Sequence, residues 1–505
     1  MNDAVTSFAI NFIAVIGVLM LIVLVGIAVA ALAYYQIDKH QTKHSLRRNY
    51  PLVGRFRYLF EHLGEFFRQY FFAMDREEMP FNRAQRSWVY RAAKNIDNTV
   101  AFGSTRDLRS PGTYYFLNCP FPKLSEESTR SVSMRIGPYC TEPYDAPSWF
   151  NVSGMSYGAL SKPAVQALSR GAQLAGCWMN TGEGGIAPYH LEGGCDLVCQ
   201  IGTAKYGVRD EHGLLSDEKL REKADIRQVR MFEIKLSQGA KPGKGGMLPA
   251  EKVSAEVASI RGIPEGHASI SPNRHPEIDS IGDLLDMIGH VRSVTGKPCG
   301  IKLVLGSAHW LDDFCQMIHD RGIESAPDFI TLDSSDGGTG AAPMPLMDSV
   351  GLPLRESLPV LVNKLLEHGL RERIRLVASG KLITPTDVAA ALCMGADFVV
   401  SARGFMFSLG CIQAMQCNRN TCPAGVTTHD PDLQRGLVPA DKAERVRHFH
   451  DNLVHEVELI AHSCGVSEPR LLRREHAAMV VEGGRSVPLN IIYPEPRADA
   501  GTGIV

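Results

Sequence analysis

Short apolar runs, each followed by a loop and in most cases by a helical pattern, recur between residues 150 and 404. Eight such runs lie near residues 152, 179, 199, 233, 302, 331, 377 and 399, and amphipathic stretches such as 284–294 and 354–366 separate them. Strands that alternate with helices form a parallel sheet, and eight of them can close into a barrel. We therefore predict an α/β fold, a (β/α)8 TIM barrel with its site at the carboxyl ends of the strands.

The regions on either side of these runs indicate four parts in the 505-residue chain. A barrel of this type needs roughly 250 residues, and we assign it to residues 150–430. Residues 1–36 are predicted to be a transmembrane anchor, and 37–149 a juxtamembrane, barrel-wrapping segment with a helix over 83–96. Residues 431–505 are expected to cover the barrel, with a helix over 440–464.

The amino-terminal region contains 22 consecutive uncharged residues, from Phe12 to Ala33. This run is long enough to cross a hydrocarbon core of about 30 Å, whereas a cleaved signal peptide has a shorter apolar run and a basic start. A buried core helix is the alternative. Asp3 is the single charge before the run, and four basic residues follow it: Lys39, Lys43, Arg47 and Arg48. The positive-inside rule then predicts a single-pass protein of the cell (inner) membrane with a cytoplasmic catalytic domain.

The next stretch, residues 56–72, combines many aromatic residues with arginines. Two interpretations remain open. It is either an amphipathic helix at the membrane interface or a segment that packs on the barrel.

Charge and cysteine content indicate whether the protein binds nucleic acid and in which redox compartment it folds. The formal net charge is −2, so the chain carries no overall basic footprint for nucleic acid. Twelve cysteines in a large, core-rich chain, three of them clustered, fit a reducing compartment better than a disulfide framework. Cys119 and Cys140 stand singly and are interpreted as structural.

The stretch 376–430 places a predicted anion site beside a group of thiols. It reads as a strand, a glycine turn at Gly380, a helix that starts at Pro385 and a second strand that ends before Arg403. Glycine turns and helix N-termini after successive barrel strands are suited to a phosphate. A C-x5-C-x4-C pattern follows at once, formed by Cys411, Cys417 and Cys422. These thiols are either ligands of a metal cluster or three buried structural cysteines. This arrangement predicts a flavin next to an iron–sulfur centre.

Seven motifs then resemble one family. GMSYGALS, NTGEGG, QGAKPGKGGMLP, KLV, DGGTGAAP, the GADF strand and the cysteine run are similar to the FMN-binding synthase domain of glutamate synthase, in the family's order, over about residues 150–430. The resemblance implies a barrel that carries FMN and a 3Fe–4S cluster. It also implies an oxidoreductase acting on CH-NH2 donors, which reduces 2-iminoglutarate, formed from 2-oxoglutarate and ammonia, to L-glutamate.

The resemblance assigns roles to residues of this chain. Cys411, Cys417 and Cys422 would hold the cluster, and three thiolates leave one cube corner without a protein ligand. The flavin ring would lie against Gly154, Met155 and Ser156, and Lys302 would stabilise the reduced ring. Residues in or near the phosphate-binding loops would be Asp336, Gly337, Gly338, Thr339, Gly380, Lys381, Arg403 and Gly404. The catalytic positions that bind 2-oxoglutarate would be Lys241, Gln238 and Glu183.

Several departures from the family pattern affect the functional prediction. The family usually has Gly-Gly where this chain has Gly380-Lys381, and often a small residue in place of Arg403. A glutaminase domain, a C-terminal β-helix and a GxGxxG motif after a strand are not expected in this sequence. Ammonia and electrons are then expected from outside this chain. The electron donor would be a separate protein such as ferredoxin or a reductase subunit.

The alternative is a membrane-anchored flavin and Fe–S redox protein that acts on another amine or on quinone and forms no glutamate. The apolar run favours this alternative, whereas Gln238 and Lys241 favour the synthase.

Overall fold

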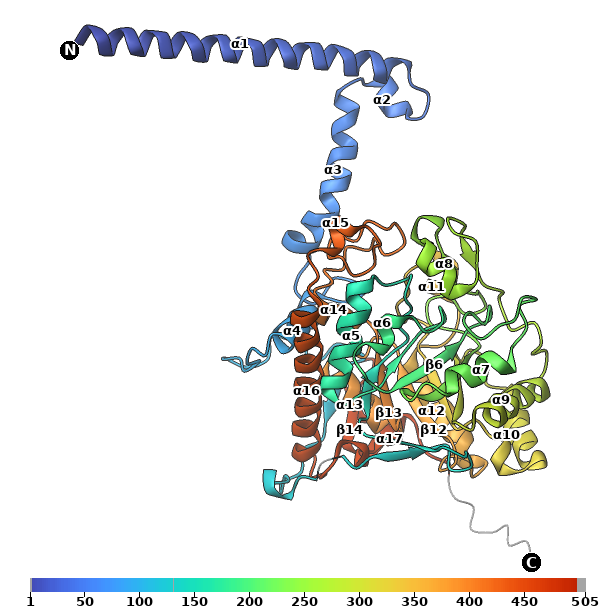
Figure 1. The fold of residues 1–505 in the computed structure, drawn as a ribbon. Helices are drawn as coiled ribbons and strands as arrows, with labels where there is room; N and C mark the ends of the chain where they lie inside the picture. Colours follow the sequence, from blue (N-terminus) through green and yellow to red (C-terminus); the bar gives the residue numbers. More distant parts are fainter. Residues whose placement is uncertain (1, 130, 497–505) are drawn as a thin grey trace, which may run out of the picture. The chain divides into compact units, whose positions relative to one another are not determined.

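The computed structural model of the chain describes residues 2–129 and 131–496 and divides into two compact units, Met1–Ala84 and Gln85–Val505. The larger unit contains a closed barrel of eight parallel strands, which confirms the predicted fold (Figure 1). Each strand pairs with the next, and β13 pairs with β4 in the register Val399 opposite Phe150, which closes the ring. The strands are β4 (Phe150–Val152), β5 (Met179–Asn180), β6 (Leu197–Ile201), β7 (Val229–Lys235), β10 (Cys299–Leu303), β11 (Phe329–Asp333), β12 (Arg375–Ser379) and β13 (Phe398–Ser401).

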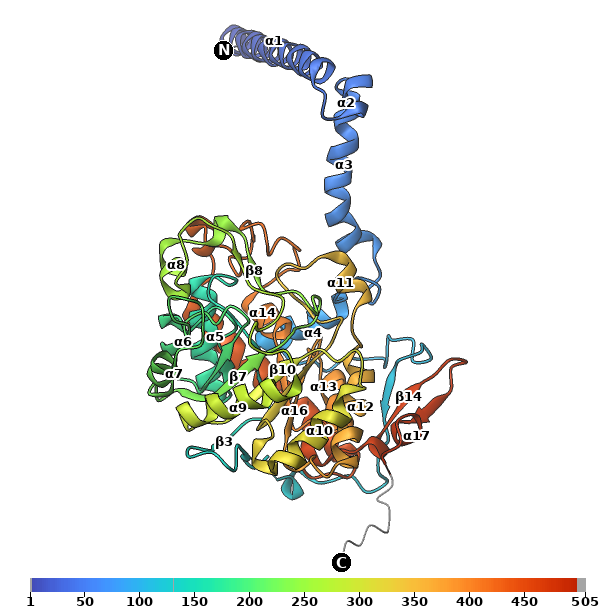
Figure 2. The same ribbon diagram turned by 90° about the vertical axis from the view of Figure 1, so that its right-hand side faces the viewer.

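Helices surround the strands, as Figure 2 shows for β7 and β10 with α9, α10 and α12 outside them. Local sequence sets their ends. Ser161 caps the first of these helices by accepting a hydrogen bond from Ala164 N–H, and Gly176 ends it in the left-handed conformation. Thr384 and Pro385 begin α13 in the same manner. The helices are α5 (Lys162–Ala175), α6 (Pro188–Leu191), α7 (Asp217–Ala224), α9 (Ile281–Thr295), α10 (Trp310–Arg321), α11 (Met344–Ser349), α12 (Leu354–Glu367), α13 (Pro385–Cys393) and α14 (Arg403–Leu409).

An insertion between β7 and α9 lies at the carboxyl end of the barrel strands. It contains the two-stranded hairpin of β8 (Met247–Leu248) and β9 (Ser269–Ile270), the 3-10 turn Ala250–Lys252 and α8 (Ala255–Arg261). A second hairpin, β2 (Met134–Ile136) with β3 (Tyr144–Ala146), precedes the barrel.

The ends of the larger unit meet on the outside of the barrel. The helix α16 (Pro439–Ser463) lies beside α5 (Figure 1). Its Phe449 packs edge-on against Phe150 and Phe405. Trp88 of α4 (Arg83–Ala93) donates a hydrogen bond to Glu456 of α16. The remaining elements are β1 (Tyr114–Phe116), β14 (Ala477–Val480) and β15 (Ser486–Pro488), which form one antiparallel sheet, with α15 (Pro431–Gln434) and α17 (Leu489–Ile492).

The smaller unit contains α1 (Asn2–His40), α2 (Ser45–Asn49), α3 (Val53–Phe67) and a π-helical turn (Arg68–Phe72). By length and composition Val5–His40 is long and apolar enough to cross a membrane, and an 18-residue window within it has a mean hydropathy of 3.2. The side chain of Asp38 is fully buried and pairs with Arg47 and Arg55, each at 2.7 Å. These ion pairs join the end of α1 to α2 and α3. Residues 56–72, for which two interpretations were open, lie in α3 and the π-helical turn.

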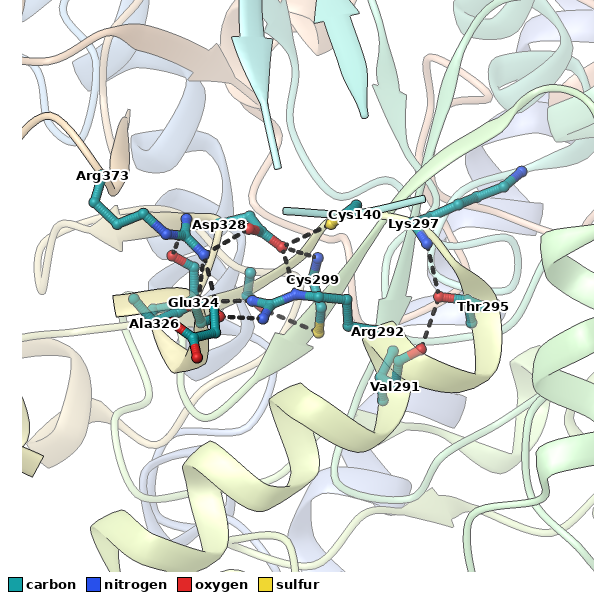
Figure 3. A network of polar contacts seen from close by, with 12 residues as sticks. Cys140, Val291, Arg292, Thr295, Lys297, Cys299, Glu324, Ala326, Asp328 and Arg373 are labelled. Carbon is teal, nitrogen blue, oxygen red and sulfur yellow. Dashed lines mark hydrogen bonds and ion pairs between the residues drawn. The ribbon is translucent and has the colours of Figure 1, made fainter. Parts of the chain in front are cut away.

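A buried carboxylate organises the other end of the barrel, where β10 and β11 begin (Figure 3). Asp328 is fully buried and accepts hydrogen bonds from Arg292 at 3.1 Å, from Arg373 at 3.0 Å and from the backbone N–H of Cys299 at 2.9 Å. The thiol of Cys140 lies 3.4 Å from the same carboxylate. Asp328 therefore pairs with two guanidinium groups and joins α9 to the beginnings of β10, β11 and β12.

We expect the Asp328→Asn substitution to lower the free energy of unfolding by about 3–5 kcal/mol, since it leaves two largely buried guanidinium groups without a counter-charge. The midpoint of urea unfolding, followed by circular dichroism, measures the loss. Asp313→Asn on the exposed face of α10 is the matched control and should leave the midpoint unchanged. A shift of equal size in the two variants would contradict this role of Asp328.

Candidate active site

A cavity of about 180 Å³ lies at the carboxyl ends of the barrel strands. Its wall combines the loops after β4, β5, β7, β11, β12 and β13, because parallel strands in a closed barrel direct all these loops to one face. The predicted residues that line it are Gly154, Met155, Ser156, Glu183, Gln238, Lys241, Lys302, Gly338, Thr339, Gly380, Lys381, Arg403 and Cys417. The predicted residues outside its lining are Asp336, Gly337, Gly404, Cys411 and Cys422.

Glu183 lines the cavity, and two glycines lie close to its side chain. Its carboxylate pairs with Lys235 at 3.1 Å, and the Lys235 ammonium also donates a hydrogen bond to the side-chain oxygen of Gln238. A Cβ atom at Gly246 would lie 2.4 Å from the Glu183 carboxylate, so this glycine of the KPGKGG segment makes room for it. The side chains of Glu183, Lys235 and Gln238 are thereby held together at the cavity.

Burial and neighbouring charge set the ionisation of these groups. Burial alone would raise the pKa of Glu183, but Lys235 and Lys241 outweigh it and the pKa is lowered, so the carboxylate is charged. Burial lowers the pKa of Lys241 to about 8, and Lys235 and Lys244 add to this effect while Glu183 opposes it. Lys241 is therefore an ammonium that loses its proton only slightly above neutral pH.

The barrel interior beneath the cavity is polar. Glu233 accepts hydrogen bonds from Asn180 at 2.8 Å, from Gln200 at 2.6 Å and from Thr331 at 2.6 Å. Lys302 lies 3.4 Å from Asp333. Burial would lower the pKa of Lys302, but Asp333 and Glu233 outweigh it and the pKa is raised. The lysine that the sequence placed in an apolar strand is thus a fixed cation in the cavity wall.

The charge of the whole wall is strongly positive. Its two acidic residues are Glu183 and Asp333, and its seven basic residues are Lys235, Lys241, Lys252, Arg261, Lys302, Lys381 and Arg403. Buried cations without partners are costly, so such an excess is typical of a site that binds anions.

Arg403 connects two of the predicted loops. Its guanidinium donates a hydrogen bond to the carbonyl oxygen of Thr339 at 2.6 Å and contacts the sulfur of Cys417 at 3.7 Å. Lys381 has a φ of 53° and an ion pair with Asp336 at 3.0 Å. Gly404 also makes room for packing, because a Cβ atom there would lie 2.7 Å from the ring of Phe449.

The three cysteines of the C-x5-C-x4-C run lie in the loop that follows α14. Cys411 and Cys422 are buried, and Cys417 is half-buried. The Lys252 ammonium is held at the edge of this loop by the carbonyl oxygens of Ala159, at 2.7 Å, and Cys417, at 3.2 Å. Among the residues that the structure describes, no three His, Cys, Asp or Glu side chains converge on a single metal-ion position.

Three basic residues of the wall were not predicted from the sequence. Lys235 is the last residue of β7, and a lysine in a buried strand is costly unless it has a partner or a ligand, so the sequence could have indicated it. Lys252 and Arg261 belong to the insertion after β7, where no periodicity or motif marks them. Their position depends on how the insertion folds over the barrel end.

Comparison with known proteins identifies the family. The conserved region in glutamate synthase matches residues 123–467. The chain is 40% identical to the glutamate synthase large subunit-like protein YerD of Bacillus subtilis (strain 168), over 95% of this chain and 98% of that protein. It is 30% identical to an archaeal-type glutamate synthase (NADPH) of Thermotoga sp. (strain RQ2), over 74% of this chain and 70% of that protein. The chain therefore belongs to the glutamate synthase family and is an oxidoreductase of that family.

Proposed function

We propose that the chain is an FMN- and iron–sulfur-dependent synthase, which reduces 2-iminoglutarate, formed from 2-oxoglutarate and ammonia, to L-glutamate with electrons from a separate donor. The positive wall of the cavity, seven basic against two acidic residues, carries this proposal. A flavin phosphate and a dicarboxylate both need fixed cations, because carboxylates and phosphates without partners are expensive to desolvate.

The cavity wall fits FMN. The glycine-containing loops around Gly338 and Gly380 and the guanidinium of Arg403 offer a phosphate backbone donors and a charge. The hydroxyl of Ser401 in the same wall is buried and has no hydrogen-bond partner among the described residues, which suits a bound polar group. The pKa of Lys302 is raised, so its ammonium stays charged and would stabilise the anionic form of the reduced flavin ring.

Lys241, Gln238 and Glu183 are proposed to hold the second ligand. Lys241 would pair with a carboxylate of 2-oxoglutarate, and Gln238, positioned by Lys235, would donate a hydrogen bond from its amide. Glu183 is charged, so it would stabilise the cationic nitrogen of the imine. When bound, FMN would supply the hydride equivalent, and the cluster would pass electrons from the separate donor to the flavin.

Cys411, Cys417 and Cys422 are proposed to hold the 3Fe–4S cluster. Each thiolate of such a cluster binds a different iron, so its ligands surround the cluster and need not converge on one atom. Burial would raise the pKa of Cys422, but hydrogen bonds from Thr427 and Ala424 outweigh it and the pKa is lowered, as suits a thiolate ligand. By contrast, burial raises the pKa of Cys411 to about 11. The contact of Arg403 with Cys417 would place the cluster beside the phosphate loops.

We expect Lys241→Met to weaken 2-oxoglutarate binding by about tenfold or more while FMN stays bound, because one charged hydrogen bond is worth about 1.5–3 kcal/mol. The assay is anaerobic reoxidation of the reduced enzyme by ammonia and 2-oxoglutarate. Lys244→Met, exposed in the same loop, is the matched control and should retain near-normal affinity. If the unsubstituted enzyme is neither reoxidised nor able to bind 2-oxoglutarate, the proposal of glutamate formation fails. The alternative, a redox protein that acts on another amine or on quinone, then replaces it.

The pH dependence follows from the same lysine. Lys241 is charged below its pKa of about 8 and neutral above it. The affinity for 2-oxoglutarate, measured by calorimetry without ammonia, should therefore be constant near pH 7 and fall as the pH rises through 8. In Lys241→Met the affinity should be low and nearly independent of pH over this range. An equal decline in both proteins would assign the titration to another group.

We expect Cys417→Ser to lose iron and the broad visible absorbance while much of the flavin stays bound, since the cluster would lose one of three ligands. Iron analysis and the absorbance spectrum measure this. Cys119→Ser, a single cysteine outside the loop, is the control and should keep its iron. Unchanged iron content in Cys417→Ser would end the cluster proposal.

We also propose that the chain is a single-pass membrane protein with its larger unit in the cytoplasm. The length and hydropathy of Val5–His40 and the basic residues after Ala33 support this. Large apolar side chains of the 56–72 stretch are exposed, Phe60 at 65% and Phe71 at 75%, which favours contact of this stretch with lipid.

Deletion of residues 1–36 should release the protein from membranes in part, because the apolar stretch at 56–72 would still adhere. Fractionation of membranes and soluble extract measures the release. A tag at the carboxyl terminus should be protected from protease added outside intact cells, and cleavage there would contradict the orientation.

A further inference from the structure

A second cavity, of about 220 Å³, lies outside the catalytic one, between α12, α13 and the segment before β1. Its floor is apolar and is formed by Leu354, Leu358, Leu382, Ala390 and Met394. Its rim is charged and carries Arg106, Arg355, Lys381, Asp336 and Asp387. The cavity thus presents an apolar pocket beneath groups of both signs.

The two arginines of this rim are available to a ligand. Neither guanidinium donates a hydrogen bond to another residue in the part of the chain that the structure describes, and both residues are largely exposed. A Cβ atom at Gly112 would lie 2.7 Å from Arg355, so this glycine accommodates the guanidinium. Lys381 differs from them, because it already pairs with Asp336 at 3.0 Å.

The acidic side of the rim is Asp387 in the first turn of α13. Its carboxylate accepts a hydrogen bond from the Thr384 hydroxyl at 2.6 Å. Burial raises the pKa of Asp387, and Thr384 and Arg106 offset this effect only in part. A cationic ligand group next to this carboxylate would therefore be favoured.

We propose that this second cavity binds a small α-amino acid with an apolar side chain. The carboxylate of the ligand would pair with Arg355 and Arg106, its ammonium with Asp387, and its side chain would lie on the apolar floor. Gly380 and Lys381 line this cavity and the catalytic one, so the bound amino acid would contact a loop of the active site from behind. The site is then placed to influence the catalytic cavity.

The test is calorimetry with the full-length protein and three probes of similar apolar shape. L-leucine has both charges, 4-methylpentanoate lacks the ammonium and 3-methylbutylamine lacks the carboxylate. We expect saturable binding of L-leucine, and binding weaker by about tenfold or more for each of the other two probes. Equal binding of 4-methylpentanoate would overturn the amino-acid assignment, and absence of L-leucine binding at millimolar concentration would overturn the site.

Variants locate the binding. Arg355→Ala should weaken L-leucine binding by about tenfold, since one charged pair is lost, whereas Arg485→Ala, an exposed arginine of the turn between β14 and β15, should not change it. Saturating 2-oxoglutarate should change the affinity for L-leucine at most to a limiting value, because the two sites are distinct and share one loop. An apparent Kd for L-leucine that rises without limit as 2-oxoglutarate is raised, or equal affinity in Arg355→Ala, would place the amino acid elsewhere and refute the proposal. Because binding is measured directly, these results do not depend on glutamate formation.

Discussion

The pairing of β13 with β4 is the constraint on which the site depends. Phe150 lies opposite Val399, and Val152 opposite Ser401, so the loops after the first and the eighth barrel strand become neighbours although some 250 residues separate them. Contacts across the barrel end complete the arrangement. The backbone N–H of Gly239 donates to Asp333, and that of Ala240 to the carbonyl oxygen of Ser335. A cavity wall with side chains from six loops exists only because the ring is closed.

The two ends of the barrel differ in how their acidic and basic residues are paired. At the amino ends of the strands, Asp328 forms ion pairs with Arg292 and Arg373, and these pairs link α9 to the beginnings of β11 and β12. At the carboxyl ends, seven basic residues face two acidic ones across a cavity. Paired buried charges serve the fold, whereas an excess of one sign weakens it unless a ligand restores the balance. The difference separates the stabilising end of the barrel from the reactive end.

The sequence predicted the architecture well because strands and helices have local signatures. All eight barrel strands lie where the apolar runs predicted them, and α9, α12, α13 and α16 agree closely with the expected helices. The site was predicted less completely. Residues in motif loops, such as Glu183 and Lys241, do line the cavity, but their chemical roles stay predictions.

The remaining features of the site depend on tertiary packing. Arg261 reaches the cavity because the long insertion folds over the barrel end, and no local pattern encodes that path. Gly404 was predicted for the phosphate-binding loops, and the packing of the Phe449 ring, 45 residues later, against it could not be read from the local sequence. Lys235 was within reach of sequence reasoning, since a lysine in a buried barrel strand needs a partner or a ligand.

The contacts that cover the barrel also determine the order in which the protein can be completed during synthesis. Trp88 bonds to Glu456, and Tyr114 lies opposite Met479, so early segments have partners near the end of the chain. Such distant contacts form late because a long loop must close first. A ribosome-bound chain that has already made the barrel strands therefore still exposes the apolar face of α5 and the edge of β1, and it is most prone to aggregation in that interval.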